Sequence, residues 1–149
     1  MKKIFPFIMI MAVVGLVLFV SGQDGPASHV FNKTIINFYE LLFGQVSSAQ
    51  NQSLTFWIRK TGHVVQYFGI TLILFFALQK IKLSRLYAFT FSYIGAFLLA
   101  CLDEWRQVAL PQRTGTFQDV LIDGIGIVAA MVVLIVYFFI TDGSAKKSE

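Results

Sequence analysis

The sequence predicts an all-α membrane protein, a polytopic bundle of four transmembrane helices with one short amphipathic helix on the outer leaflet. Of its 149 residues, 56% are hydrophobic and only 13% are charged, and the mean hydropathy is +0.71. Soluble domains carry about 25% charged residues, so this composition is typical of a membrane protein. Four long apolar runs and a one-sided distribution of basic residues support the same class. The length suits a single domain covering residues 1–149.

The four apolar runs cover residues 4–20, 61–78, 86–102 and 120–140. At about 1.5 Å per residue, such helices match or nearly match a hydrocarbon core of about 30 Å. None shows the strict alternation of an outer-membrane barrel strand. The first run follows two lysines, as a signal peptide would, but its apolar stretch exceeds the usual length of about 7–15 residues. We therefore expect an uncleaved anchor, and cleavage would leave three spans in the same orientation.

The segment between the first two runs, residues 21–57, is the only long stretch without a predicted span. Four apolar side chains recur in it at helical spacing: Phe31, Ile35, Phe38 and Leu42. This spacing predicts a short amphipathic helix, with Ser28 as its N-cap, that lies on the outer leaflet or covers the bundle. The alternative is a helix that serves packing alone.

Basic residues predict the orientation. Seven of the twelve Lys and Arg residues fall on one side of a four-span bundle: Lys2, Lys3, Lys80, Lys82, Arg85, Lys146 and Lys147. Cytoplasmic loops are enriched in Lys and Arg, so we expect a multi-pass protein of the cell membrane with both termini in the cytoplasm. The remaining five then face outward: Lys33, Arg59, Lys60, Arg106 and Arg113.

Polar side chains gather at the outward ends of the last three spans. The second run opens with Lys60, His63 and Tyr67, which share one helical stripe, and the third closes with Asp103, Glu104 and Gln107. A turn bracketed by Pro111 and Gly115 then carries Arg113, and Asp119 and Asp123 open the fourth run at positions i and i+4. Ionisable groups are costly inside a membrane, so this grouping predicts either a site or an internal ion network.

Each member also has a simpler interpretation. Lys60 could extend to the interface, Tyr67 could belong to an aromatic belt, and a lone His63 is more often a hydrogen-bonded core residue. Asp119 could cap its helix, whereas Asp123 lies too deep to do so. The adjacent carboxylates of the third run oppose the helix dipole and predict cationic partners among Lys60, Arg106 and Arg113. Gly126 provides a small residue against which another helix can pack.

In order and spacing, these motifs resemble the VanZ-like family of membrane proteins. The motifs are Lys60-x-x-His63-x-x-x-Tyr67, Asp103-Glu104-x-x-Gln107 and Pro111-x-Arg113-x-Gly115-x-x-x-Asp119-Val120-x-x-Asp123-x-x-Gly126, within residues 59–126. The family is named for a member associated with resistance to the glycopeptide teicoplanin, which implies a contribution to glycopeptide tolerance. Gln66, Arg106 and Gln112 stand where family members often have an acidic residue, His and Gly. Two of these departures remove titratable groups and weaken a metal-centre or acid–base interpretation.

Three functions remain open. The first is an outward-facing site that binds or shields an anionic lipid or cell-wall intermediate, using the polar residues named above. The second is a membrane enzyme acting on a lipid-linked or phosphate-bearing envelope substrate, with His63 and Glu104 as acid–base candidates. The third is a structural ion network in a scaffold protein, alone or as a homo-oligomer. We expect no cofactor, no metal and no nucleic acid, and the single cysteine, Cys101, excludes an intrachain disulfide.

Overall fold

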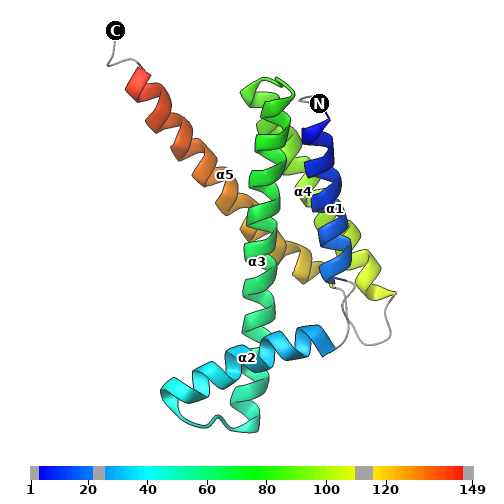
Figure 1. The fold of residues 1–149 in the computed structure, drawn as a ribbon, viewed down its shortest axis with the longest axis vertical. Coiled ribbons are helices and arrows are strands. Elements are labelled where there is room, and N and C mark those ends of the chain that lie inside the picture. Colours follow the sequence, from blue (N-terminus) through cyan, green and yellow to red (C-terminus); the bar gives the residue numbers. More distant parts are fainter. Residues whose placement is uncertain (1–3, 22–25, 110–115, 146–149) are drawn as a thin grey trace.

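A computed structural model describes residues 4–21, 26–109 and 116–145, and these ranges are almost entirely helical (Figure 1). The five helices are α1 (Phe5–Ser21), α2 (Pro26–Phe43), α3 (Ser48–Lys80), α4 (Arg85–Val108) and α5 (Phe117–Ala145). The predicted all-α class is therefore confirmed. Three of the described helices, α3, α4 and α5, are long and apolar enough to cross a membrane.

The predicted first span differs from the other three in length. It forms α1, whose 17 residues would extend only about 26 Å at 1.5 Å per residue, less than a hydrocarbon core of about 30 Å. Val13 and Val17 are buried in the main hydrophobic core, where α1 packs against α3 and α4. By length, the described helices thus provide three spans and not the expected four.

The second span belongs to a longer helix than the apolar run predicts. α3 begins at Ser48 because Ser47 and Gln50 form a capping box. The Gln50 backbone N–H donates to Ser47 Oγ at 3.3 Å, and the Ser47 N–H donates to Gln50 Oε1 at 2.8 Å. Much of the expected loop over residues 21–57 is therefore helical, formed by α2 and the polar start of α3.

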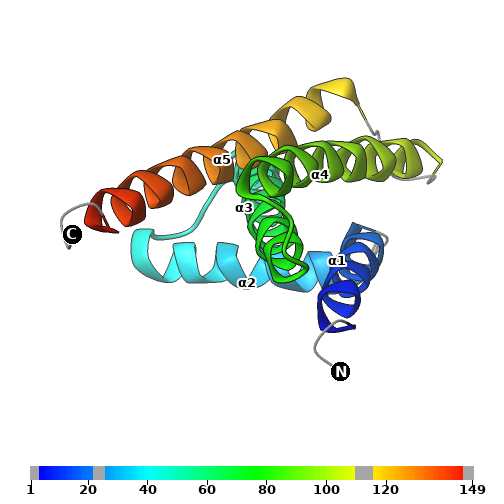
Figure 2. The same cartoon turned by 90° about the horizontal axis from the view of Figure 1, so that it is seen from above.

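α2 is the helix predicted between the first two runs, but its start differs from the prediction. Ser28 lies within the helix and is not its cap, since α2 begins at Pro26, a residue suited to the first helical position because it lacks an N–H. α2 crosses the bundle near the start of α3 and packs against that helix (Figures 1 and 2). Ile36 is buried, whereas Phe38 and Leu42 of the predicted stripe are exposed.

α3 is the central helix and contacts each of the other four. α1 and α4 run antiparallel to it, and α5 crosses it obliquely in the same direction as α3 (Figures 1 and 2). The start of α1, the α3–α4 turn and the end of α5 therefore lie at one end of the molecule (Figure 1). Lys80, Lys82 and Arg85 are at this end, where the Arg85 guanidinium lies 5.1 Å from the Phe138 ring centroid. The other four basic residues predicted on this side lie outside the described residues.

Small residues allow α4 to pack closely in the bundle. Ala88, Ser92, Ala96 and Ala100 recur every fourth residue along α4, and all are fully buried. Small side chains let helix backbones approach, which is how helices commonly associate in membranes. The next residue along this buried stripe is Glu104. The packing face of α4 therefore carries a carboxylate into the interior at one end of the bundle.

At Gly126, α5 closely approaches the backbone of α3. A Cβ added at this glycine would lie 2.1 Å from the Val64 carbonyl oxygen and 3.0 Å from the Phe68 backbone nitrogen. Both neighbours are backbone atoms, so no rotation of a side chain could relieve the overlap. The interpretation of Gly126 as a helix-packing residue is thus supported, and the helix that approaches it is α3.

We predict that Gly126→Ala separates α5 from α3 and lowers the free energy of unfolding by about 1–3 kcal/mol, as overpacking of a tight core does. Thermal unfolding of the detergent-purified chain would measure this loss. Gly124→Ala is the matched control, because an added Cβ there meets no atom within 4 Å. Equal melting temperatures for the two variants would contradict the close approach.

Candidate functional site

Two polar contacts link α3 to α5, one helical turn apart. The Lys60 ammonium forms an ion pair with Asp119, and His63 Nδ1 lies 3.0 Å from Asp123 Oδ1 in a hydrogen bond. Residue numbers rise together along the two contacts because the helices run in the same direction. The Lys60, Asp119 and His63 side chains are 18%, 16% and 20% exposed, whereas Asp123 is fully buried. The second contact therefore differs from the first in having a fully buried carboxylate.

The end of α4 adds two carboxylates that share one amide. Gln107 Nε2 donates to Asp103 Oδ2 and to Glu104 Oε1, both at 3.1 Å. Glu104 Oε2 also accepts a hydrogen bond from the Thr116 backbone N–H at 3.2 Å, which ties α4 to the start of α5. Of the cationic partners predicted for these carboxylates, Lys60 pairs with Asp119 instead. A neutral amide thus bridges two acids that a cation was expected to neutralise.

Three titratable side chains from three different helices converge in the bundle. His63, Glu104 and Asp123 each offer one nitrogen or oxygen atom, and these atoms all lie within 4.8 Å of one another. Tyr67, one turn further along α3, is completely buried and lies within electrostatic range of Asp103, Glu104 and Asp123. We call His63, Glu104 and Asp123 the inner cluster. The polar centre comprises this cluster with Lys60, Tyr67, Asp103, Gln107 and Asp119.

Some atoms of the polar centre lack a partner. Tyr67 Oη, Asp103 Oδ1 and Asp123 Oδ2 are buried and have no hydrogen-bond partner among the described residues. A buried polar atom left unpaired costs about 1–3 kcal/mol, so folded proteins usually satisfy such atoms. Three of them around one cluster mean that the described residues do not complete their own hydrogen-bond network.

Exposed tryptophans mark the level of the polar centre along the bundle. Trp57 on α3 and Trp105 on α4 are 63% and 75% exposed, and the antiparallel course of these helices brings both to the same end. Tryptophan is enriched where a membrane meets water. His63 lies about 9 Å further along α3 than Trp57, at 1.5 Å per residue. The inner cluster therefore lies just below the level that these side chains would occupy at the interface.

The structure brings most of the predicted site residues together in the polar centre. Arg113 is the exception, because it lies outside the described residues, and its predicted partner stays a prediction. Asp119 is not a helix cap, since α5 begins at Phe117 and the Asp119 side chain pairs with Lys60. Sequence reasoning missed the contribution of Thr116, because it contacts Glu104 through a backbone N–H that no side-chain pattern reveals.

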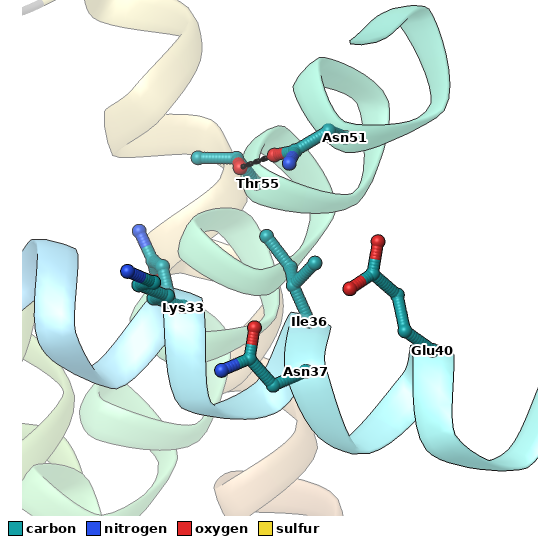
Figure 3. A pocket seen from close by; sticks show the side chains of 7 residues that line it. Lys33, Ile36, Asn37, Glu40, Asn51 and Thr55 are labelled. Carbon is teal, nitrogen blue, oxygen red and sulfur yellow. Dashed lines mark hydrogen bonds between the residues drawn. The ribbon is translucent and has the colours of Figure 1, made fainter. Parts of the chain in front are cut away.

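A groove between α2 and α3 is a separate polar feature. Its volume is about 320 Å³, and it is lined by Asn32, Lys33, Ile36, Asn37, Glu40, Asn51 and Thr55 (Figure 3). Thr55 Oγ1 donates a hydrogen bond to Asn51 Oδ1 at 3.4 Å across one turn of α3. None of the predicted site residues lines this groove. The polar centre and the groove are therefore distinct.

The fold and the polar centre describe a helical protein with membrane-length helices and an acid-rich site near one end. The family model described as VanZ/LLP1 matches residues 5–140, a range that includes every residue of the polar centre. The chain therefore belongs to the VanZ/LLP1 family, and the resemblance seen in the sequence motifs is confirmed. No curated protein and no solved structure matches the chain significantly.

We predict that the two α3–α5 contacts differ in strength. In a double-mutant cycle, His63→Ala and Asp123→Ala should show a coupling energy near the upper end of the range of about 0.6–1.7 kcal/mol known for polar contacts within membranes. Lys60→Ala and Asp119→Ala should show less, because water reaches and screens both partners of their pair, whereas Asp123 is fully buried. Unfolding of each variant in detergent would measure both cycles. A larger coupling for Lys60 and Asp119 would refute this order.

Proposed function

We propose that the chain is a multi-pass protein of the cell membrane whose polar centre faces outward and binds the phosphate-bearing headgroup of a lipid-linked envelope component. The observation that carries this proposal is the Lys60 ammonium one turn from His63 at the edge of the polar centre, together with the buried Tyr67 hydroxyl, which has no hydrogen-bond partner among the described residues. The ammonium and the hydroxyl can each donate a hydrogen bond to a phosphate oxygen. The unpaired carboxylate oxygens of Asp103 and Asp123 are acceptors, which require a donor or a cation instead.

Basic residues lie at the Lys60 end of the polar centre, which we call the rim, and they support an anionic ligand. Lys60 stands one turn outside His63, and Asp119 holds its ammonium in place. Arg59 and Arg106 lie at the same end of α3 and α4, and Arg113 follows in the connection to α5. Arginine forks and lysine ammonium groups are the side chains that proteins use to bind phosphate. The carboxylates beneath the rim would then hold these cations in position.

The outward orientation is supported by the opposite end of the molecule. Lys80, Lys82 and Arg85 cluster there, at the same end of the molecule as the start of α1 and the end of α5 (Figure 1). If this basic turn lies in the cytoplasm, as the enrichment of Lys and Arg in cytoplasmic loops indicates, the start of α1 and the end of α5 lie on that side too. The polar centre then faces the outer leaflet, with α2 lying along that surface.

We predict that a cysteine at Gln52 reacts with a membrane-impermeant thiol reagent added to intact cells, whereas a cysteine at Ser84 reacts only after the membrane is opened. Both positions are exposed, and they lie on opposite sides of the predicted spans. Cys101 would be replaced by alanine in both variants, so that labelling reports only the new thiol. The reverse labelling pattern would place the polar centre in the cytoplasm.

One observation favours catalysis as a second candidate function. Asp123 accepts or shares a proton at His63 Nδ1, an arrangement that orients an imidazole and leaves Nε2 for a substrate. Glu104 in the same cluster would be the second acid–base group. A membrane enzyme acting on a lipid-linked phosphate would use the same ligand chemistry as the binding site proposed above. Phosphate release during the binding experiment would separate the two functions.

We predict that the purified chain binds a polyprenyl phosphate in detergent and does not bind the corresponding polyprenol, which lacks the phosphate. Lys60→Gln should weaken this binding about tenfold, because a hydrogen bond to a charged group contributes about 1.5–3 kcal/mol. Lys82→Gln, at the opposite end of the bundle, is the matched control and should bind as the unaltered chain does. Equal binding of phosphate and alcohol would sink the proposal.

The same proposal links the site to glycopeptide tolerance, since a protein that holds or shields envelope precursors would limit access of the drug to them. In cells, His63→Ala, Glu104→Gln, Arg113→Ala and Asp123→Asn would lose tolerance while still accumulating in the membrane. Loss of tolerance in step with loss of the protein would support the structural network instead. Immunoblots of membrane fractions and growth in the presence of drug measure the two quantities.

A further inference from the structure

The inner cluster brings three potential metal-ligand side chains together. Its three side chains extend from α3, α4 and α5, and their donor atoms lie within 4.8 Å of one another. Around a zinc ion with bonds of about 2.0–2.2 Å, neighbouring donor atoms stand roughly 3.0–3.5 Å apart. The distance between His63 Nδ1 and Asp123 Oδ1, 3.0 Å, already falls in this range. The distances from the Glu104 donor atom to the other two are at most 4.8 Å.

The donor set indicates which class of metal would bind. One imidazole nitrogen with two carboxylate oxygens suits divalent transition metals, above all zinc, whereas calcium and magnesium prefer oxygen ligands alone. Three protein ligands also leave a fourth position open, as in zinc sites that bind substrates. Metal binding would displace the proton shared between His63 and Asp123, because these ligands coordinate in their deprotonated forms.

Neighbouring groups orient the Glu104 ligand from both sides. Gln107 donates to Glu104 Oε1, and the Thr116 N–H donates to Glu104 Oε2. Such outer hydrogen bonds are a regular feature of metal sites, and their loss typically weakens metal binding about 10–100-fold. Because Gln107 also holds Asp103, one amide positions both carboxylates of α4.

An independent observation points to a ligand at this place. Asp123 is fully buried, and its Oδ2 has no hydrogen-bond partner among the described residues, although its Oδ1 is bound to His63. The Tyr67 hydroxyl lies on the same face of α3 as His63 and is also buried. It likewise has no hydrogen-bond partner among the described residues. A cation beside the inner cluster would stabilise both oxygens and offset the repulsion between Glu104 and Asp123.

We propose that His63, Glu104 and Asp123 bind one divalent transition-metal ion, with Gln107 as a positioning residue and Tyr67 lining the open side. This site departs from the expectation, drawn from the sequence, that the protein holds no metal. It does not depend on the proposed phosphate ligand, because the ion can be measured alone. The proposed metal site and the proposed headgroup site can therefore be refuted independently.

The experiment titrates zinc into the full-length chain after it has been purified in detergent and stripped with a chelator. Calorimetry should give one ion per chain, and His63→Gln and Asp123→Asn should each weaken binding at least tenfold. Gln107→Ala should weaken it less, without changing the number of ions bound. His29→Gln is the matched control, because His29 is the only other histidine of the chain. This variant should bind zinc with the same affinity as the unaltered protein.

Cobalt provides a measurement that does not depend on any variant. The unaltered chain should give ligand-field bands of an ion bound by nitrogen and oxygen, and zinc should remove them. A thiolate charge-transfer band would instead place the ion at Cys101 and overturn the proposal. Two other results would also overturn it: no binding above a detergent blank, or the same affinity in His63→Gln, Asp123→Asn and the unaltered chain.

Discussion

The polar centre depends on the close approach of α5 to the backbone of α3 at Gly126. A side chain at this position would overlap the Val64 carbonyl oxygen, so glycine sets the distance between the two helices. Only at that distance can the short side chain of Asp123 reach His63, and only in a parallel pair does Asp119 then reach Lys60 one turn outward. The stripe of small residues on α4 completes the arrangement by bringing Glu104 to the same place. The packing of the helix backbones thus positions the side chains of the polar centre.

This packing buries charged side chains in a position that costs free energy. A carboxylate near the middle of a membrane helix costs several kcal/mol unless it is paired or reached by water. Asp119 is paired with Lys60 near the rim, and Asp123 is paired with His63 at greater depth. Asp103 and Glu104 share a neutral amide, which orders them without cancelling their charge. Hydrogen bonds therefore order the carboxylates of α4, and their charge is left to other groups around them.

The fold class and most members of the site could be predicted from the sequence because hydropathy and side-chain spacing are local signals. Lys60, His63 and Tyr67 are spaced at i, i+3 and i+7, so they lie on one face of any α-helix. Gly126 follows Asp123 by three residues and lies on the same face of its helix. The early start of α3 was missed, although the Ser47 and Gln50 capping box was readable, because its first turns are polar. The pairing of Lys60 with Asp119 could not be predicted, since the choice among several carboxylates depends on which helices are adjacent and which way they run. The Thr116 contact was hidden for a different reason, because a backbone N–H leaves no trace in composition.

Charge balance connects the headgroup site to the metal site. Four carboxylates of the polar centre face one lysine and one histidine, an excess of negative charge that would repel a phosphate approaching the inner cluster. A divalent ion on His63, Glu104 and Asp123 would offset two of the four carboxylate charges and so weaken this repulsion, because a bound metal is the largest charge in its surroundings. Lys60 at the rim, one turn from His63, would attract the same anion. If both proposals hold, the depth at which a headgroup binds would depend on whether the inner cluster carries a metal.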